Sequence, residues 1–158
     1  MVLFVGSVYA ADVKIGVIDT SKILSDSKAA KNAKIAFNKE VETKQTTYAA
    51  KQKEVQTMQE ELSSKGKDMA PAVYTEKTSK YSTASKELTR LKSEIETELK
   101  AKDTELSRKL LSEISAIVTD FRKKENYTFI FEKNYIAAYD SAVDITDKII
   151  ALYDATVK

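Results

Sequence analysis

The sequence predicts an α+β fold that is mostly α: a long antiparallel helical hairpin, or coiled-coil arm, on a small β body formed by the two chain ends. The chain has 158 residues, three Gly and one Pro, and from residue 18 onward only Gly66 and Pro71 interrupt it. Between residues 40 and 90 only seven are Leu, Ile, Val, Met or Phe, too few for a globular core. The dense β-prone runs, "VKIGVI" at 13–18 and "YTFIF" at 127–131, lie near the ends.

The first ten residues, "MVLFVGSVYA", indicate the remnant of a secretory signal cleaved after Ala10. They form an apolar run followed by small residues, although no Lys or Arg precedes the run. The alternative is an N-terminal strand or a fraying tail. The first interpretation predicts an exported mature chain.

The next segment, residues 11–27, belongs to the predicted body and leads into the arm. "VKIGVID" is typical of a buried strand, and Asp19 or Thr20 follows it as a helix cap. From residue 28 to 64 nothing breaks a helix, and Pro71 suits the first turn of a second helix that extends to about residue 124. Residues 28–124 are therefore predicted to form the hairpin arm, with its tip near residues 65–70.

Two apolar ladders with a seven-residue spacing support this hairpin, because such a repeat is typical of helices that wind around each other. An antiparallel turn pairs residues whose numbers sum to 136, which places Tyr48 beside Leu88 and Val41 beside Ile95. The second half of the seam is weaker, because lysines occupy several of its positions. The first ladder is Val41, Tyr48, Val55 and Leu62 on one helix, with Tyr74, Tyr81, Leu88 and Ile95 on the other; the second is Lys44, Lys51 and Met58, with Leu91, Ala84 and Lys77.

Residues 125–158 complete the predicted body. "NYTFIFE" and "NYIAAYD" predict strands at 128–132 and 136–139 that share one sheet with 13–18, and Asp144 is expected to cap a terminal helix. One chain has too few strands to close a barrel, and bare sheet edges invite aggregation. We therefore expect four apolar side chains to fill the body or to meet neighbouring subunits: Ile15, Val17, Phe129 and Phe131.

The composition argues against enzymatic chemistry. The chain has no His and no Cys, so the usual His general bases, thiol nucleophiles and zinc sites are missing, and no glycine-rich loop could hold a phosphate. We expect no catalytic site, no metal site and no cofactor. A net charge of +2, with lysines matched by acidic residues around the tip, predicts no nucleic-acid binding.

The segments "AADVKIGVIDTSKILSDSKAAKNA" and "FIFEKNYIAAYDSAVDITDKIIALYD", separated by the long charged hairpin, resemble the Skp/OmpH family of periplasmic chaperones. The resemblance covers nearly all of the mature chain, and the order and spacing of its elements carry it. It implies a periplasmic homotrimer that holds unfolded outer-membrane β-barrel proteins between helical arms without ATP. Many relatives are strongly basic, whereas this chain is nearly neutral, so contact with membrane lipid or lipopolysaccharide stays open.

In a holdase of this kind, the client would meet short apolar side chains among polar ones on the arms. The candidates are Val55, Met58, Met69 and Val73. Methionine offers an adaptable surface for varied sequences. The competing interpretation is a structural coiled-coil spacer or adaptor of the cell envelope, whose seam would look much the same.

Overall fold

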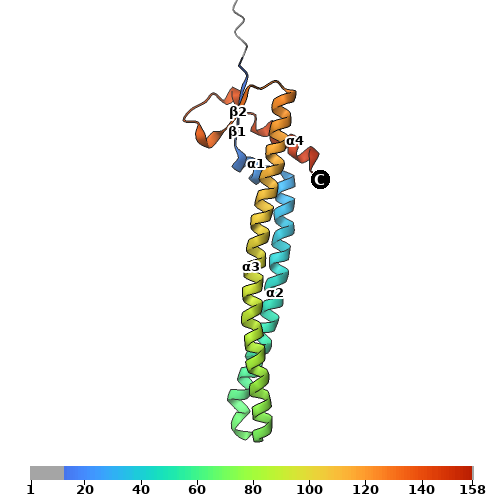
Figure 1. Cartoon of the computed structure of the whole chain (residues 1–158), viewed down its shortest axis with the longest axis vertical. Coiled ribbons are helices and arrows are strands. Elements are labelled where there is room, and N and C mark those ends of the chain that lie inside the picture. Colours follow the sequence, from blue (N-terminus) through green and yellow to red (C-terminus); the bar gives the residue numbers. More distant parts are fainter. Residues whose placement is uncertain (1–12, 158) are drawn as a thin grey trace, which may run out of the picture. The chain divides into compact units, whose positions relative to one another are not determined.

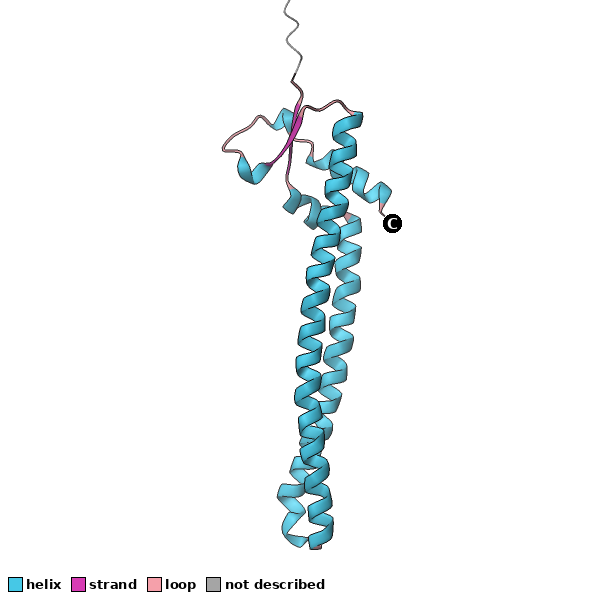
Figure 2. Cartoon of the chain, in the orientation of Figure 1, coloured by secondary structure: helices cyan, strands magenta, loops and turns pink. Residues whose placement is uncertain are grey.

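The computed structural model describes residues 13–157 and is mostly helical, with a small sheet. The described chain divides into two compact units: the body, which holds the residues up to Asn32 and from Lys109 on, and the arm, Ala33–Arg108. In chain order the elements are β1 (Ile15–Ile18), α1 (Thr20–Asp26), α2 (Lys28–Lys65), the 3-10 turn η1 (Gly66–Asp68), α3 (Pro71–Lys124), β2 (Phe129–Glu132), the 3-10 turns η2 (Lys133–Tyr135) and η3 (Ser141–Val143), and α4 (Thr146–Thr156) (Figures 1 and 2).

The arm is an antiparallel pair of helices whose ends follow the sequence. The run without Gly or Pro carries α2 to Lys65, and Pro71 opens α3, as predicted. Seven of the eight members of the first apolar ladder are buried or half-buried, which confirms that this stripe faces the seam. Tyr74 is the exception: 45% of it is exposed, and its ring lies so close to Gly66 that a Cβ there would meet Cε2 at 2.9 Å.

Three ion pairs link the two helices of the arm. They are Lys77–Glu61 at 2.8 Å, Lys44–Glu98 at 2.8 Å, and Lys102–Glu40. The residue numbers of the first pair sum to 138 and those of the other two to 142, against a predicted 136 for backbone positions directly opposite each other.

The direction in which helical side chains lean accounts for this difference. Side chains point toward the N-terminus of their own helix, so in an antiparallel pair they lean in opposite directions. Long side chains that meet across the seam therefore have residue numbers that sum to more than those of backbone positions directly opposite each other. The ion pairs do not test the predicted sum of 136, which stays a prediction. Tyr48, expected to pack on Leu88, shares a groove with Ile95 and Leu99.

The sheet of the body brings the two chain ends together. Strand β1 pairs in parallel with β2, with Ile15 opposite Phe129 and Val17 opposite Phe131. Two of the three predicted strands are therefore confirmed, and they share one sheet as expected.

The third predicted strand, 136–139, is wrong: none of these residues is in a strand in the described chain. Directly after β2 the chain coils into the turn η2, where the Ile136 N–H donates to the Lys133 carbonyl at 3.0 Å. The second edge of β1 is occupied by another segment. Asp144 forms a bridge with Val17, and the Ile145 N–H donates to the Val17 carbonyl at 2.9 Å.

The start of each short body helix shows how its polar groups are satisfied. Asp19 caps α1 as predicted, because its carboxylate accepts the Lys22 N–H at 2.9 Å. The expected cap of α4 is wrong by one position: Ile145 occupies the N-cap, and Asp144 accepts the Thr146 N–H at 2.9 Å from just outside the helix. These bonds fix the starts of α1 and α4.

The core of the body gathers buried side chains from β1, from all four helices and from the segments that lead into β2 and α4. Tyr153 of α4 is fully buried, and its hydroxyl donates to the Glu113 carboxylate of α3 at 2.8 Å. Burial and this carboxylate raise the pKa of Tyr153 well above its usual range. The buried members of the core are Ile18, Ile23, Ala30, Ile114, Tyr127, Ile145, Ile149 and Tyr153.

Candidate functional site

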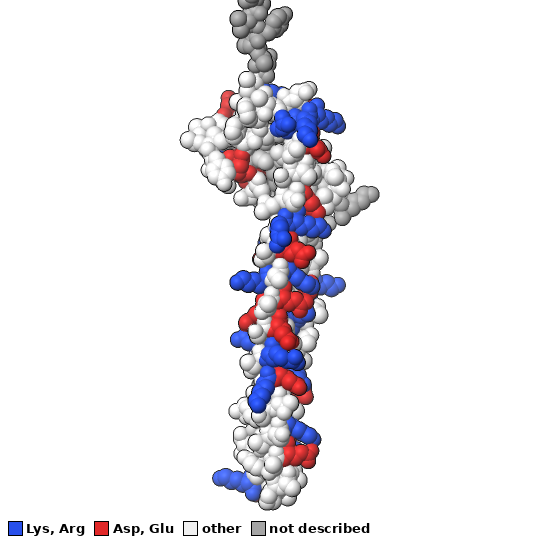
Figure 3. All heavy atoms as spheres, in the orientation of Figure 1, with Lys and Arg blue, Asp and Glu red and all other residues white. Residues whose placement is uncertain are grey.

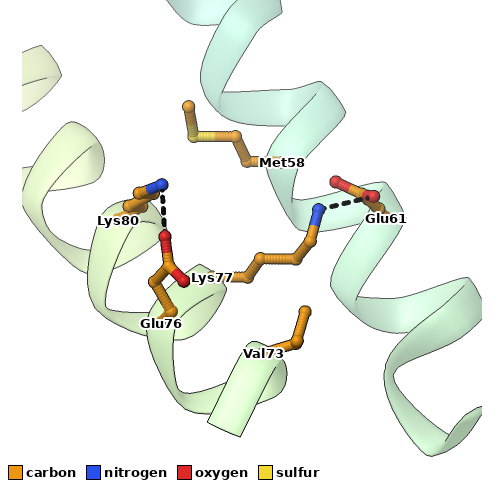
Figure 4. Close-up of a pocket in the computed structure, with 6 residues that line it drawn as sticks. All are labelled: Met58, Glu61, Val73, Glu76, Lys77 and Lys80. Carbon is orange, nitrogen blue, oxygen red and sulfur yellow. Dashed lines mark hydrogen bonds and ion pairs between the residues drawn. The ribbon is translucent and has the colours of Figure 1, made fainter. Parts of the chain in front are cut away.

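A groove near the tip of the arm brings two of the predicted client-binding residues together. Met58 of α2 and Val73 of α3 line it, and four charged residues from the same two helices complete it: Glu61, Glu76, Lys77 and Lys80 (Figure 4). We call these six residues the tip groove. It encloses about 180 Å³, which is below the roughly 300–1,000 Å³ of small-molecule sites. The tip groove therefore suits a single side chain rather than a whole ligand.

The charges around the tip groove neutralise one another in pairs. The Lys77 ammonium lies 2.8 Å from Glu61 across the two helices, and Lys80 lies 2.6 Å from Glu76 along α3 (Figure 4). The hydrogen bond from Lys77 holds the pKa of Glu61 below its usual value, and that from Lys80 does the same for the pKa of Glu76. Glu61 and Glu76 therefore stay charged near neutral pH, and the two acidic side chains face two basic ones.

The other two predicted client-binding residues lie outside the tip groove. Val55 is only 6% exposed, because it faces the seam, so a client could not reach it without opening the helices. Met69 follows the turn η1 and is half-buried there. Met58 and Val73 are therefore neighbours in one groove and Val55 packs within the arm, while client binding by the four residues stays a prediction.

A second groove on the arm has no counterpart in the sequence predictions. Its floor is apolar and its rim carries Lys92 and Glu96, whose charged groups lie 3.8 Å apart. It encloses about 260 Å³, again less than a small-molecule site usually offers. We call it the mid-arm groove; its residues are Gln45, Tyr48, Lys92, Ile95, Glu96 and Leu99.

The charges of the arm are interspersed rather than gathered. On the face shown in Figure 3, blue and red side chains alternate along the helices of the arm, with uncharged surface between them. The body carries a basic group in the last turn of α3, formed by Arg122, Lys123 and Lys124. Positive side chains there interact favourably with the carbonyl end of the helix.

One face of the small sheet exposes apolar side chains. Ile15 is 42% exposed, Phe129 52% and Phe131 44%, and the two phenylalanine rings stack with centroids 5.7 Å apart. Alternate residues of a strand share a face, and residues opposite in register share it too. Val17 belongs to this face but is 1% exposed, so it is already covered within the chain and cannot meet a partner. Of the four predicted body residues, three remain available to a partner, and we call Ile15, Phe129 and Phe131 the sheet face.

Two features are absent from the described residues. No helix there is long and apolar enough to cross a membrane. Nor does any cluster of three or more His, Cys, Asp or Glu side chains there offer a place for a metal ion.

Comparisons with known proteins give consistent results. The model of the family described as "Outer membrane protein (OmpH-like)" matches residues 14–153. An uncharacterized protein of Aquifex aeolicus (strain VF5) is 26% identical over 154 residues, which cover 98% of this chain and 93% of that protein. A crystal structure of a proposed outer membrane chaperone (OmpH-like) from Caulobacter crescentus CB15 matches with a TM-score of 0.84 at 13% identity, covering 99% of this chain and 93% of that one. At this identity the structural match shows the fold.

Proposed function

Because the chain belongs to the outer membrane protein (OmpH-like) family, we propose that it is an ATP-independent periplasmic holdase. It binds unfolded outer-membrane β-barrel proteins on its helical arms and prevents their aggregation. The predicted signal remnant, whose residues 1–10 lie outside the described residues, and its cleavage after Ala10 are part of this proposal. Membership of the family supports the chaperone class, and the arm supports the mode of binding.

The observation that carries the proposal is the character of the arm grooves. Each is open, is lined by apolar side chains together with paired opposite charges, and encloses less volume than a small-molecule site. A holdase without ATP must release its client spontaneously, so it needs many weak contacts rather than one tight contact. Shallow grooves for single side chains provide contacts of this kind.

We also propose that three copies assemble through the sheet face. Phe129 and Phe131 form one exposed, stacked aromatic surface beside Ile15. Contiguous exposed apolar surface commonly marks an interface. Assembly would cover this surface and would supply three arms for one client, so that weak contacts add through a high effective concentration.

The proposal is tested by diluting an outer-membrane protein from urea into the mature chain without nucleotide and passing the mixture over a sizing column. We expect the client to elute in a soluble complex with the protein. A client that pellets equally with and without it would contradict the holdase function and favour the alternative, a coiled-coil spacer or adaptor of the envelope.

A further inference from the structure

We propose that each arm carries two separate subsites for extended polypeptide, one on each flank of the helical seam, and that each takes one aliphatic side chain. The subsites are the tip groove and the mid-arm groove. The inference rests on the proposed function and specifies what the arm binds: uncharged, extended segments in which apolar and polar residues alternate. The proposed ligand is therefore neither a small molecule nor a strongly charged polypeptide.

The seven-residue repeat places the two grooves on opposite flanks. When the positions are lettered a to g, with Val41 and Ile95 at a, the seam consists of the a and d positions. At about 100° per residue, positions e and b lie beyond a on one flank, whereas g and c lie beyond d on the other. The mid-arm residues Gln45, Tyr48, Lys92, Ile95, Glu96 and Leu99 occupy e, a, e, a, b and e; the tip residues Met58, Glu61, Val73, Glu76, Lys77 and Lys80 occupy d, g, g, c, d and g.

Both subsites offer the same chemistry to a chain. An extended backbone presents N–H donors and carbonyl acceptors, and its side chains point alternately to opposite sides. Glu61 and Glu76 at the tip, or Glu96 at mid-arm, are acceptors for the N–H groups, whereas the neighbouring lysines are donors for the carbonyls. The paired positive and negative side chains match the alternating N–H and carbonyl groups of the peptide backbone. Because the charges balance, they do not favour an occupant with a net charge.

The apolar floor of each subsite then receives the side chain that points into it. Met58 and Val73 are the apolar side chains that line the tip groove, with the Lys77 stem between them (Figure 4), and Val73 is 43% exposed, so its methyl groups are accessible. Ile95 and Leu99, beside Tyr48, form the floor at mid-arm. An enclosed volume of about 180 or 260 Å³ limits each subsite to roughly one side chain.

The opposite placement has a consequence for the bound client. Tyr48 and Met58 are ten residues apart on α2, about 15 Å along the helix axis. One straight strand cannot lie on both flanks, so two different segments, or a chain that bends around the arm, must fill the two subsites. Bound segments are thereby kept apart by the helices, which prevents their edges from pairing with each other.

Four methyl groups of the arm provide a direct test. Met58 and Ile95 lie in the two subsites, whereas Met69 and Ile35 belong to the arm outside both, and Ile35 is 65% exposed. The mature protein, labelled at Met and Ile methyl groups, is titrated with a nine-residue peptide that is acetylated and amidated and alternates Leu or Val with Ser or Thr. We expect saturable NMR shifts of the Met58 and Ile95 methyls, with Met69 and Ile35 unmoved.

A substitution separates the two subsites. Val73→Asp places a charge in the tip groove at a half-exposed position and should weaken binding reported by Met58 at least about tenfold, because the burial of one aliphatic side chain is lost. The binding curve of Ile95 should not change. The matched control, Ile35→Asp, introduces the same charge elsewhere on the arm and should alter neither curve.

The inference is wrong if either subsite methyl fails to shift, if all four methyls shift alike, or if Val73→Asp abolishes both responses. These outcomes differ from a failure of the proposed function. A protein that keeps an outer-membrane protein soluble but shows no subsite shifts is a holdase without these subsites. If the peptide shifts the two methyl signals but the protein does not protect a client from aggregation, the subsites are supported and the holdase function is wrong.

Discussion

Replacing Phe129 with Asp tests whether the sheet face joins subunits. A Phe side chain buries about 150–250 Å² when fully covered, and Phe129 is 52% exposed in the single chain. About half of that area therefore remains for a partner to cover. At about 25 cal/mol per Å², this corresponds to about 2–3 kcal/mol per subunit, a contribution that every copy would lose.

The assay is light scattering of the mature protein over a concentration series. We expect the unaltered protein to have three times the mass of one chain and Phe129→Asp to have the mass of a monomer, because a carboxylate cannot enter an apolar interface unpaired. The unfolding temperature of the mature protein should also fall, because the exposed half of the ring no longer has a partner to cover it.

The matched control is Ile35→Asp, which adds the same charge at an exposed arm position and should keep the trimer mass. The interpretation of the sheet face is wrong if Phe129→Asp retains the unaltered mass and stability. If the unaltered protein has the mass of one chain, the proposed trimer itself is wrong.

Three further predictions concern stability. Ile95→Asp should lower the melting temperature of the arm helices in circular dichroism, because one half-buried side chain contributes up to about 1.5–3 kcal/mol; an unchanged melt would exclude Ile95 from the seam. Gly66→Ala should push the Tyr74 ring aside, since a Cβ there lies 2.9 Å from Cε2; in a double-mutant cycle its cost should vanish in a Tyr74→Ala background. The hydrogen bond from the Lys22 N–H lowers the pKa of Asp19, so its carboxylate stabilises the fold above about pH 4 and this contribution is lost as the pH falls through the lowered pKa. Asp19→Asn keeps a good helix cap and should reduce the fall of the melting temperature at acid pH, measured by melts at successive pH values. If the melting temperature of the variant falls as steeply as before, other groups cause the acid sensitivity.

The ends of the long helices could be predicted because they depend on local chemistry. Gly66 and Pro71 are the only interruptions after residue 18, so α2 and α3 end and begin beside them. The same holds for β1 and β2, whose apolar β-prone residues lie next to strong turn and cap signals.

The strand expected at 136–139 shows where local patterns fail. Its composition is compatible with a strand, but strand formation requires an available edge. Asp144 occupies the second edge of β1, and η2 redirects the chain directly after β2. Which segment occupies a strand edge depends on the packing of the whole body. It cannot be deduced from the alternation of apolar and polar residues within one segment.

The grooves were only half predictable for a related reason. The sequence indicates Met58 and Val73 as apolar residues on a polar arm, whereas the lysines and acidic residues around the tip indicate only balanced charge. The tip groove forms because Lys77 occupies a seam position near Met58 but directs its ammonium outward to Glu61. The seam beside Met58 is therefore incompletely filled. The direction of a long side chain decides this, and the sequence does not specify it.

The proposed holdase function is tested most directly by the turbidity of an outer-membrane protein diluted from urea, with the mature protein present or absent. The arms are expected to carry the activity, so the variant used lacks residues 45–91: it retains the body and the base of the hairpin, but it loses the whole tip groove and the α2 side of the mid-arm groove, Gln45 and Tyr48. We predict that the full chain suppresses the turbidity without ATP and that the shortened chain does not. Equal turbidity with and without the full chain, or equal suppression by the shortened chain, would contradict the account.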